Sequence, residues 1–504
     1  MSGVPKLLLI YAVAIPLAIL LGFLISAPGM GSIVVIGLLL FLFLLPVLLQ
    51  HHHLLLILFW GSAFNVFFLP GQPHFWLLLA FLSFGISWLN NIMGEKNFPS
   101  IPELTRPLLF FGIVVLATAL SRGGLASRVF GGESYGGRGY YYIFGAILGF
   151  FALSAVRVPR VKAVSWTGWY FLSGVTFALS NLVFVLGPSF YILYLLLPPE
   201  YAVSQATSEM GDTDIIRITG LSPCFIAVIC FLFARFGVRG VLDWRRPWVG
   251  IVFVLSVIAA GFGGFRSAYI LIGLLFVIQF LFEGLQRTMY LPIGIGCGLA
   301  GFIAVFALSP SLPLSLQRAV SFIPGVRVSS EVAVNADESW QWRLDMWKVL
   351  LPEVPRYLVL GKGYHIDGEE LYLVDLATQM GLATDSSEEL RLAGGYHSGP
   401  FSVVLTFGIF GAIGFLWIAF AGIRFLYRNY RYGDPAFRQV NTFLLAFFVA
   451  HVIFFILCYG DIRDDLSVFT GVLGLSLSIN GLVKKPARAR RLAAAVAELQ
   501  PQMA

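Results

Sequence analysis

Apolar runs of about 20 residues divide this sequence, and they restrict the chain to a membrane-embedded fold. A helix needs roughly 20 apolar residues to cross the hydrocarbon core of a bilayer. Only 12% of the residues are charged, against roughly 25% in a soluble domain. We therefore expect an all-α polytopic membrane protein with about 12–14 transmembrane helices. Candidate spans begin near residues 6, 32, 53, 74, 108, 140, 166, 221, 247, 267, 288, 399, 438 and 464.

Basic residues at the ends of these runs predict which side each loop occupies. Cytoplasmic loops of membrane proteins carry an excess of Lys and Arg. Placing the four strongest clusters in the cytoplasm makes the intervening spans alternate correctly and puts both termini there. One glycine-rich loop, with Arg122, Arg128 and Arg138, breaks the rule. The four clusters are 157–162, 235–246, 424–438 and 484–491.

This topology divides the chain into five parts. The long polar segment 309–398 lies on the outer side and is far longer than an ordinary connection, so we expect it to be functional. Its tryptophans near residues 340–347 indicate a helix lying at the membrane interface. The other parts are N-terminal helices (1–200), central helices with outer-face arginines (201–308), C-terminal helices (399–483) and a basic cytoplasmic tail (484–504).

A histidine stands where one late span meets the outer compartment. His397-Ser398 is followed after nine residues by Gly408-x-x-Gly411. At 100° per residue, Gly408 would share a helix face with His397, and small residues on that face would form a helix-packing motif. Neutral imidazole can accept a proton near pH 7, so we predict a catalytic role for His397. The alternative is an interfacial histidine that only hydrogen-bonds a neighbour.

Three arginines are predicted on the same side of the membrane. Arg266 opens a span after a Gly-rich turn, Arg343 lies among the loop tryptophans, and Arg217 precedes another span. Guanidinium groups bind phosphate oxygens in a bidentate manner, so together these residues predict a site for a diphosphate. Taken singly, each could instead contact lipid headgroups.

Other polar residues indicate no further site. We expect His51, His52, His53 and His451 to have structural roles. The four cysteines lie in apolar runs or at their edges, without disulfide or metal spacing. The net charge of +7 includes no basic cluster on a soluble domain, which argues against nucleic-acid binding. No metal and no cofactor are expected.

The motif and its surroundings resemble the O-antigen ligase and polymerase superfamily of bacterial envelope enzymes. The ligase pattern is a histidine, then Asn, Ser or Gln, nine residues, Gly, two residues, and Gly, Thr or Tyr. His397, Ser398, Gly408 and Gly411 match it in full. Arg266, Arg343 and the Gly361-Lys-Gly363 turn also resemble positions of the family. The resemblance covers about residues 205–425 and does not distinguish ligases from polymerases.

The resemblance implies a metal-independent, inverting membrane glycosyltransferase of the bacterial inner membrane. Its donor would be a glycan on undecaprenyl diphosphate, and its acceptor a saccharide or a lipid A core. It would act at the periplasmic face in surface polysaccharide biosynthesis, with membrane lipids and other export proteins as further partners. His397 would be the general base, and Arg266, Arg343 and Arg217 would bind the diphosphate.

Two other classes of function stay open. The chain could be a transporter or flippase of a lipid-linked saccharide, or a scaffold in an export complex. Transporters usually show internal repeats and polar residues near the bilayer midplane. Here the predicted charges lie at the outer boundary, which favours an enzyme acting there.

Overall fold

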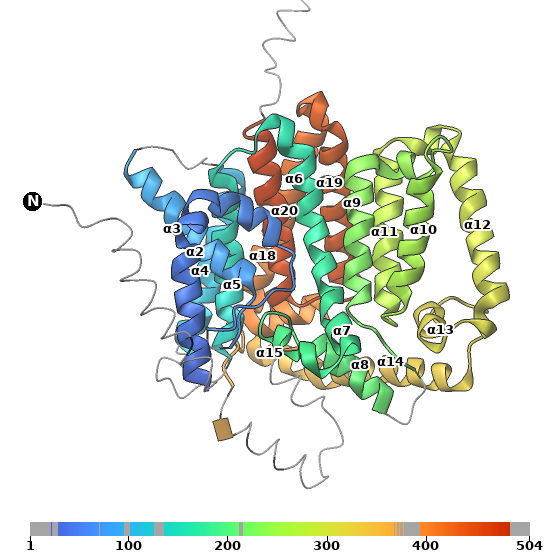
Figure 1. Ribbon diagram of the computed structural model, residues 1–504, viewed down its shortest axis with the longest axis horizontal. Helices are drawn as coiled ribbons and strands as arrows, with labels where there is room; N and C mark the ends of the chain where they lie inside the picture. Colours follow the sequence, from blue (N-terminus) through green and yellow to red (C-terminus); the bar gives the residue numbers. More distant parts are fainter. Residues whose placement is uncertain are drawn as a thin grey trace, which may run out of the picture.

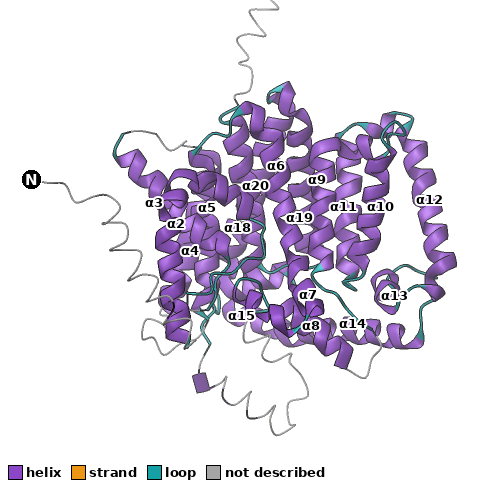
Figure 2. Ribbon diagram, viewed as in Figure 1, coloured by secondary structure: helices purple, strands orange, loops and turns teal. Residues whose placement is uncertain are grey.

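The fold is an assembly of helices, seen in a computed structural model. The structure describes residues 29–69, 71–94, 101–124, 136–210, 215–366 and 394–483, with the isolated residues 22, 368, 369, 372 and 376. These residues form helices and no strand (Figure 2), so the expected all-α class is confirmed. The expected first span and the basic tail lie outside the described residues.

The helices run in chain order from one edge of the bundle to the other and back to its centre (Figure 1). Short 3-10 turns connect several of them. The helices are α2 (Met30–Phe59), α3 (Phe75–Ile92), α4 (Pro102–Arg122), α5 (Gly137–Ala155), α6 (Ala163–Leu172), α7 (Phe177–Leu186), α8 (Glu200–Met210), α9 (Leu221–Val241), α10 (Pro247–Gly261), α11 (Arg266–Phe282), α12 (Tyr290–Leu308), α13 (Leu314–Val320), α14 (Ser330–Leu350), α15 (Val354–Tyr357), α18 (Gly399–Tyr432), α19 (Arg438–Leu457) and α20 (Ile462–Asn480).

Apolar length supports a multi-pass membrane protein. Among the described residues, eight helices are long and apolar enough to cross a bilayer, and α10 and α11 are shorter apolar helices. The runs expected near residues 32 and 53 are a single helix, α2, bent at His51. The prediction of two separate spans is therefore wrong here. The sequence does not reveal that one helix continues through the polar triplet 51–53.

Phenylalanine packing holds the centre of the bundle together. Phe415 of α18, Phe455 of α19 and Phe469 of α20 are all buried, and the rings of Phe415 and Phe455 are 4.7 Å apart between centroids. Phe455 and Phe469 meet edge to face at 5.8 Å. Such pairs add about 0.5–1.5 kcal/mol each beyond simple burial. The helix that follows His397 is therefore fixed in a rigid core.

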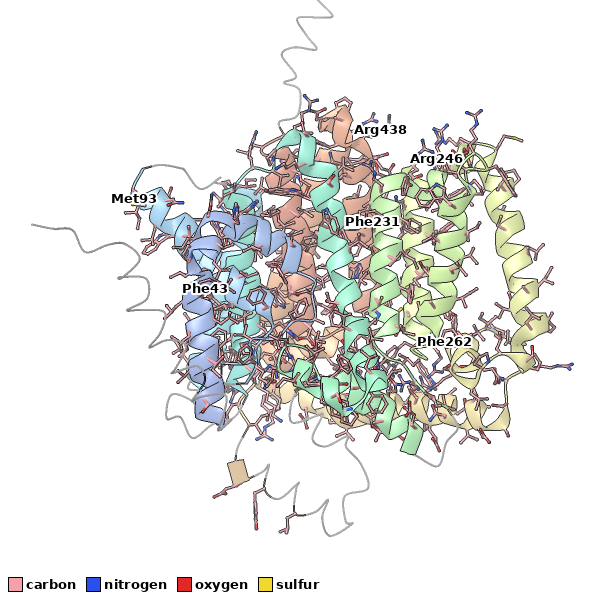
Figure 3. The ribbon with its side chains drawn as sticks, in the orientation of Figure 1. Phe43, Met93, Phe231, Arg246, Phe262 and Arg438 are labelled. Carbon is pink, nitrogen blue, oxygen red and sulfur yellow. The ribbon has the colours of Figure 1, made fainter. Side chains whose placement is uncertain are left out.

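Basic loops gather at one end of the bundle. Arg160 forms an ion pair of 2.6 Å with Asp434, which joins two of the clusters predicted on one side. Figure 3 shows Arg246 and Arg438 at this same end, and Phe262 near the opposite end. α8, α13, α14 and α15 lie at that opposite end (Figure 1), which we call the α14 end.

Candidate functional site

A glycine-rich turn at the α14 end positions the first pair of arginines. The turn joins α10 to α11, and Gly264 within it has a φ of +69°, a conformation that favours glycine. Arg217 donates from Nε to the carbonyl of Gly263 at 3.4 Å, and Arg318 of α13 donates to the carbonyl of Gly264. Both guanidinium groups are thereby held beside Arg266, the first residue of α11.

Helix α14 closes the other side of this group. Arg266 donates from Nη2 to the carbonyl of Ala336 at 3.2 Å, and Arg318 donates from Nε to Asn335 Oδ1 at 2.6 Å. Arg343 lies two turns further along the same helix. The turn and α14 together place four arginines from four segments at one location.

The four positive charges lie close enough to affect one another. Burial, and secondarily the charges of Arg217, Arg266 and Arg343, lowers the pKa of Arg318 to about 9. Within the described part of the chain, none of these four side chains forms an ion pair with a carboxylate. The charge of Asp337 does act on Arg266, but it is one negative charge near four positive ones. A group with such an excess of positive charge is suited to binding an anion. We call Arg217, Arg266, Arg318 and Arg343 the arginine cluster.

His397 lies next to this cluster, just before α18. Its ring meets Trp342 of α14 edge to face, with centroids 5.2 Å apart, and Tyr459 at 5.3 Å. Its φ of +50° is unusual for a residue other than glycine, and such conformations concentrate at functional sites. Burial, and secondarily the charge of Arg343, lowers the pKa of His397. The imidazole is therefore neutral and able to accept a proton at neutral pH.

A second group of polar residues meets His397 through Tyr459, and we call Tyr459, Asp461, Asp464 and Asp465 the acidic group. Tyr459 and Asp461 belong to the loop between α19 and α20, where Asp461 accepts a hydrogen bond from Arg463 at 3.1 Å. Burial raises the pKa of Tyr459 to about 12, and the carboxylates of Asp465, Asp461 and Asp464 contribute in the same direction. The hydroxyl of Tyr459 consequently stays protonated as a donor. The ring of His397 thus lies between Trp342 of α14 and Tyr459 of this loop.

A comparison with known protein families finds a match that contains most of this site. The family model for O-antigen ligase matches residues 251–416. Over this span the chain is O-antigen ligase-like. The match includes Arg266, Arg318, Arg343 and His397, while Arg217 and Tyr459 lie outside it. No curated protein matches the chain. The resemblance seen in the sequence is confirmed, and it supports an O-antigen ligase or polymerase type of function in general.

Within the O-antigen ligase match, Gly408 departs from its expected geometry. Gly408 has φ +67° and ψ −163° and interrupts α18, so it does not continue a helical face from His397. A Cβ at Gly408 would meet the carbonyl oxygens of Val359 and Leu358 at 2.6 and 2.8 Å. The expected packing against a neighbouring helix is therefore wrong for Gly408, which packs against the loop after α15. Gly411 is buried beside Phe407 of its own helix.

The loop after α15 replaces the helical hydrogen bonds that this break removes. Ile409 donates from its backbone to the carbonyl of Leu358 at 2.6 Å. Lys362 and Gly363 donate to the carbonyls of Leu405 and Thr406, at 2.7 and 3.0 Å. Backbone groups within the membrane must find partners inside the protein. The segment 358–363 is consequently part of the structure of α18, and we call it the anchored segment.

The anchored segment also explains one arginine that opposes the sidedness rule. Arg122, at the end of α4, donates from Nε to the carbonyl of Gly361 at 2.9 Å and from Nη2 to that of Leu360 at 3.1 Å. Arg138 donates to Tyr142, and Arg128 lies outside the described residues. Arg122 is thus retained at the α14 end by a structural contact.

Replacing Gly408 by alanine should destabilise the protein. The added Cβ would clash with two backbone carbonyls, and the positive φ would cost about 1–3 kcal/mol. We expect a clearly lower unfolding temperature in detergent. Gly296→Ala is the matched control, because Gly296 is helical and nothing lies within 4 Å of its Cβ position. Equal unfolding temperatures for the two variants would contradict this account of the break.

Sequence reasoning missed Arg318, Trp342 and the acidic group. Arg318 lies in a short helix of the long loop. It belongs to the arginine cluster because the fold brings it to the glycine-rich turn between α10 and α11. A possible signal for the acidic group was the polar stretch 459–465 between two apolar runs, on the side predicted to hold Arg266. The sequence cannot show which loops meet.

Three other histidines, His52, His53 and His451, are held by structural contacts. His52 pairs with Ser83 at 2.7 Å, His53 with the carbonyl of Leu153 at 2.9 Å, and His451 with the carbonyl of Phe447 at 2.9 Å. These partners account for polar side chains in an apolar bundle. None of the three lies beside His397 or the arginine cluster.

Proposed function

We propose that the chain is a glycosyltransferase that moves a glycan from undecaprenyl diphosphate to a hydroxyl group of an acceptor sugar. The observation that carries this proposal is the position of His397 beside the arginine cluster, where its ring contacts Trp342 and Tyr459. A neutral base beside a site for a diphosphate is what such a transfer requires. The O-antigen ligase match points to the same class of reaction.

The reaction assigns a role to each part of the site. His397 takes the proton from the acceptor hydroxyl, whose oxygen attacks the anomeric carbon of the donor. The bond between that carbon and the diphosphate oxygen breaks on the opposite face, so the configuration inverts. Arg266, Arg318 and Arg343 stabilise the negative charge that develops on the departing diphosphate, and Arg217 assists them.

The acidic group is suited to binding the acceptor sugar. A protonated Tyr459 can donate a hydrogen bond to a sugar hydroxyl, and the exposed carboxylate of Asp464, in the first turn of α20, can accept one. The guanidinium groups provide the positive charge for the diphosphate, so the transfer proceeds without a metal ion. We place the α14 end at the periplasmic face of the inner membrane, because the basic loops lie at the opposite end.

The polysaccharide profile of a deletion strain tests this function. The strain is complemented with the wild-type gene or with the His397→Ala variant, and surface and lipid-linked glycans are separated on gels. Full-length chains retained on the carrier identify a ligase, whereas single repeats identify a polymerase. Restoration of the wild-type profile by His397→Ala would reject the enzyme and favour transport or a scaffold.

A further inference from the structure

A cavity opens between α12 and the rest of the bundle. The membrane-spanning window of α12 contains no buried residue, and α12 stands apart from α10 (Figure 1). The cavity has a volume of about 820 Å³ and is lined by α10, α11 and α12. Its wall is almost entirely apolar, with side chains such as Val254 and Phe276. We call it the α12 groove.

Glycines widen the α12 groove on two of its walls. Gly273 of α11 and both Gly298 and Gly301 of α12 line it, and nothing lies within 4 Å of the Cβ position of any of the three. Small residues in membrane helices ordinarily allow a second helix to approach closely. Among the residues that the structure describes, no helix fills the space that they leave.

The groove runs from residues 241–244, at the end of the bundle with the basic loops, to Tyr269, near the arginine cluster. Tyr269, one of its lining residues, follows Arg266 by three residues on α11, a rise of about 4.5 Å. The Tyr269 hydroxyl and Leu316 of α13 both lie against Gly261, the last residue of α10. Leu316 in turn is two residues from Arg318. An anionic head bound by the cluster therefore has its apolar tail at the entrance of the groove.

The head, rather than the tail, determines which lipid is selected. Bilayer tails are as apolar as the groove, so burial alone gives no preference for one chain over another. Four guanidinium groups favour a diphosphate over the single phosphate of a common phospholipid. The groove then gives the tail of a selected lipid a fixed path and so orients its head.

We propose that the α12 groove binds the polyprenyl chain of a lipid diphosphate whose head occupies the arginine cluster. This proposal rests on the proposed function for the identity of the donor, and it adds the route taken by its tail. The glycines leave room for the methyl branches of an isoprenoid chain.

A photo-crosslinking experiment tests the groove without requiring turnover. The full chain is placed in vesicles of phosphatidylethanolamine and phosphatidylglycerol with a polyprenyl diphosphate that carries a diazirine in its tail. The labelled peptides are then identified by mass spectrometry. The test variant is Gly298→Leu, which fills the groove. The control is Gly296→Leu on the same helix, because Gly296 does not line the groove and also has nothing within 4 Å of its Cβ position.

We expect labelling of α11 and α12 in the wild-type protein, and excess undecaprenyl diphosphate should compete for it. Gly298→Leu should reduce this labelling about tenfold, equivalent to about 1.4 kcal/mol, while Gly296→Leu retains it. Equal labelling of both variants, or equal competition by phosphatidylglycerol, would overturn the proposal. If the labelling is as expected but His397→Ala supports normal polysaccharide, the groove stands and the proposed glycosyl transfer fails.

Discussion

The His397→Ala variant should lose activity by a factor of about 10²–10⁴, the usual contribution of a general base. The imidazole is neutral at physiological pH. Among the described residues, no other histidine lies beside the arginine cluster. Transfer from a lipid-linked donor to an acceptor sugar would be measured in vesicles. His365→Ala provides a control, because it removes another histidine of the long loop that lies beside α4.

The pH profile gives a second measurement on the same residue. The base must be neutral, so activity falls as the pH drops through the pKa of His397, which lies below the ordinary value of 6.5. Arg343→Gln removes a charge that lowers this pKa, so the acid limb should move to higher pH. An unchanged limb, whatever the height of the profile, would contradict the assignment of His397 as the base.

Arg266→Gln should cost a factor of about 10²–10³ in turnover, comparable to the loss of one donor from an oxyanion site. Arg266→Lys should recover only part of this, because a point charge lacks the planar fork of a guanidinium group. Arg327→Gln is a matched control, since Arg327 is an exposed arginine between α13 and α14 and outside the cluster.

The unfolding temperature separates a role in binding from a role in structure. Arg266 contributes one hydrogen bond to Ala336 but also adds to the repulsion among four like charges. We expect Arg266→Gln to leave the unfolding temperature of the ligand-free protein unchanged or raised while activity falls. A parallel loss of stability and activity would show that the arginine mainly supports the fold.

The helices could be predicted from the sequence better than the site. Runs expected near residues 221, 247, 399 and 438 begin α9, α10, α18 and α19 at those residues. Apolar length is a local property, so a linear sequence records it. The break at Gly408 is different, because it depends on backbone groups about 50 residues earlier in the chain, which take over the hydrogen bonds of α18.

The arginine cluster, too, could be predicted only in part from the sequence. Arg266 and Arg217 could be predicted from their places at outer helix ends, and Arg343 from its place among the tryptophans of the long loop. The structure brings the three together. Arg318 and Tyr459 could not, because each becomes part of the site only when two distant loops meet. The interfacial helix expected near residues 338–348 is longer than predicted, and as α14 it links the cluster to His397.

The anchored segment has a mechanical consequence. The part of α18 before Gly408 begins two residues after His397, and the carbonyls of Leu405 and Thr406 near its end accept hydrogen bonds from residues 362 and 363. A displacement of the anchored segment would therefore reach His397 through less than three turns of helix. Movement of the long loop cannot be independent of the base at this point. A substrate that displaces the loop would also change the aim of the imidazole.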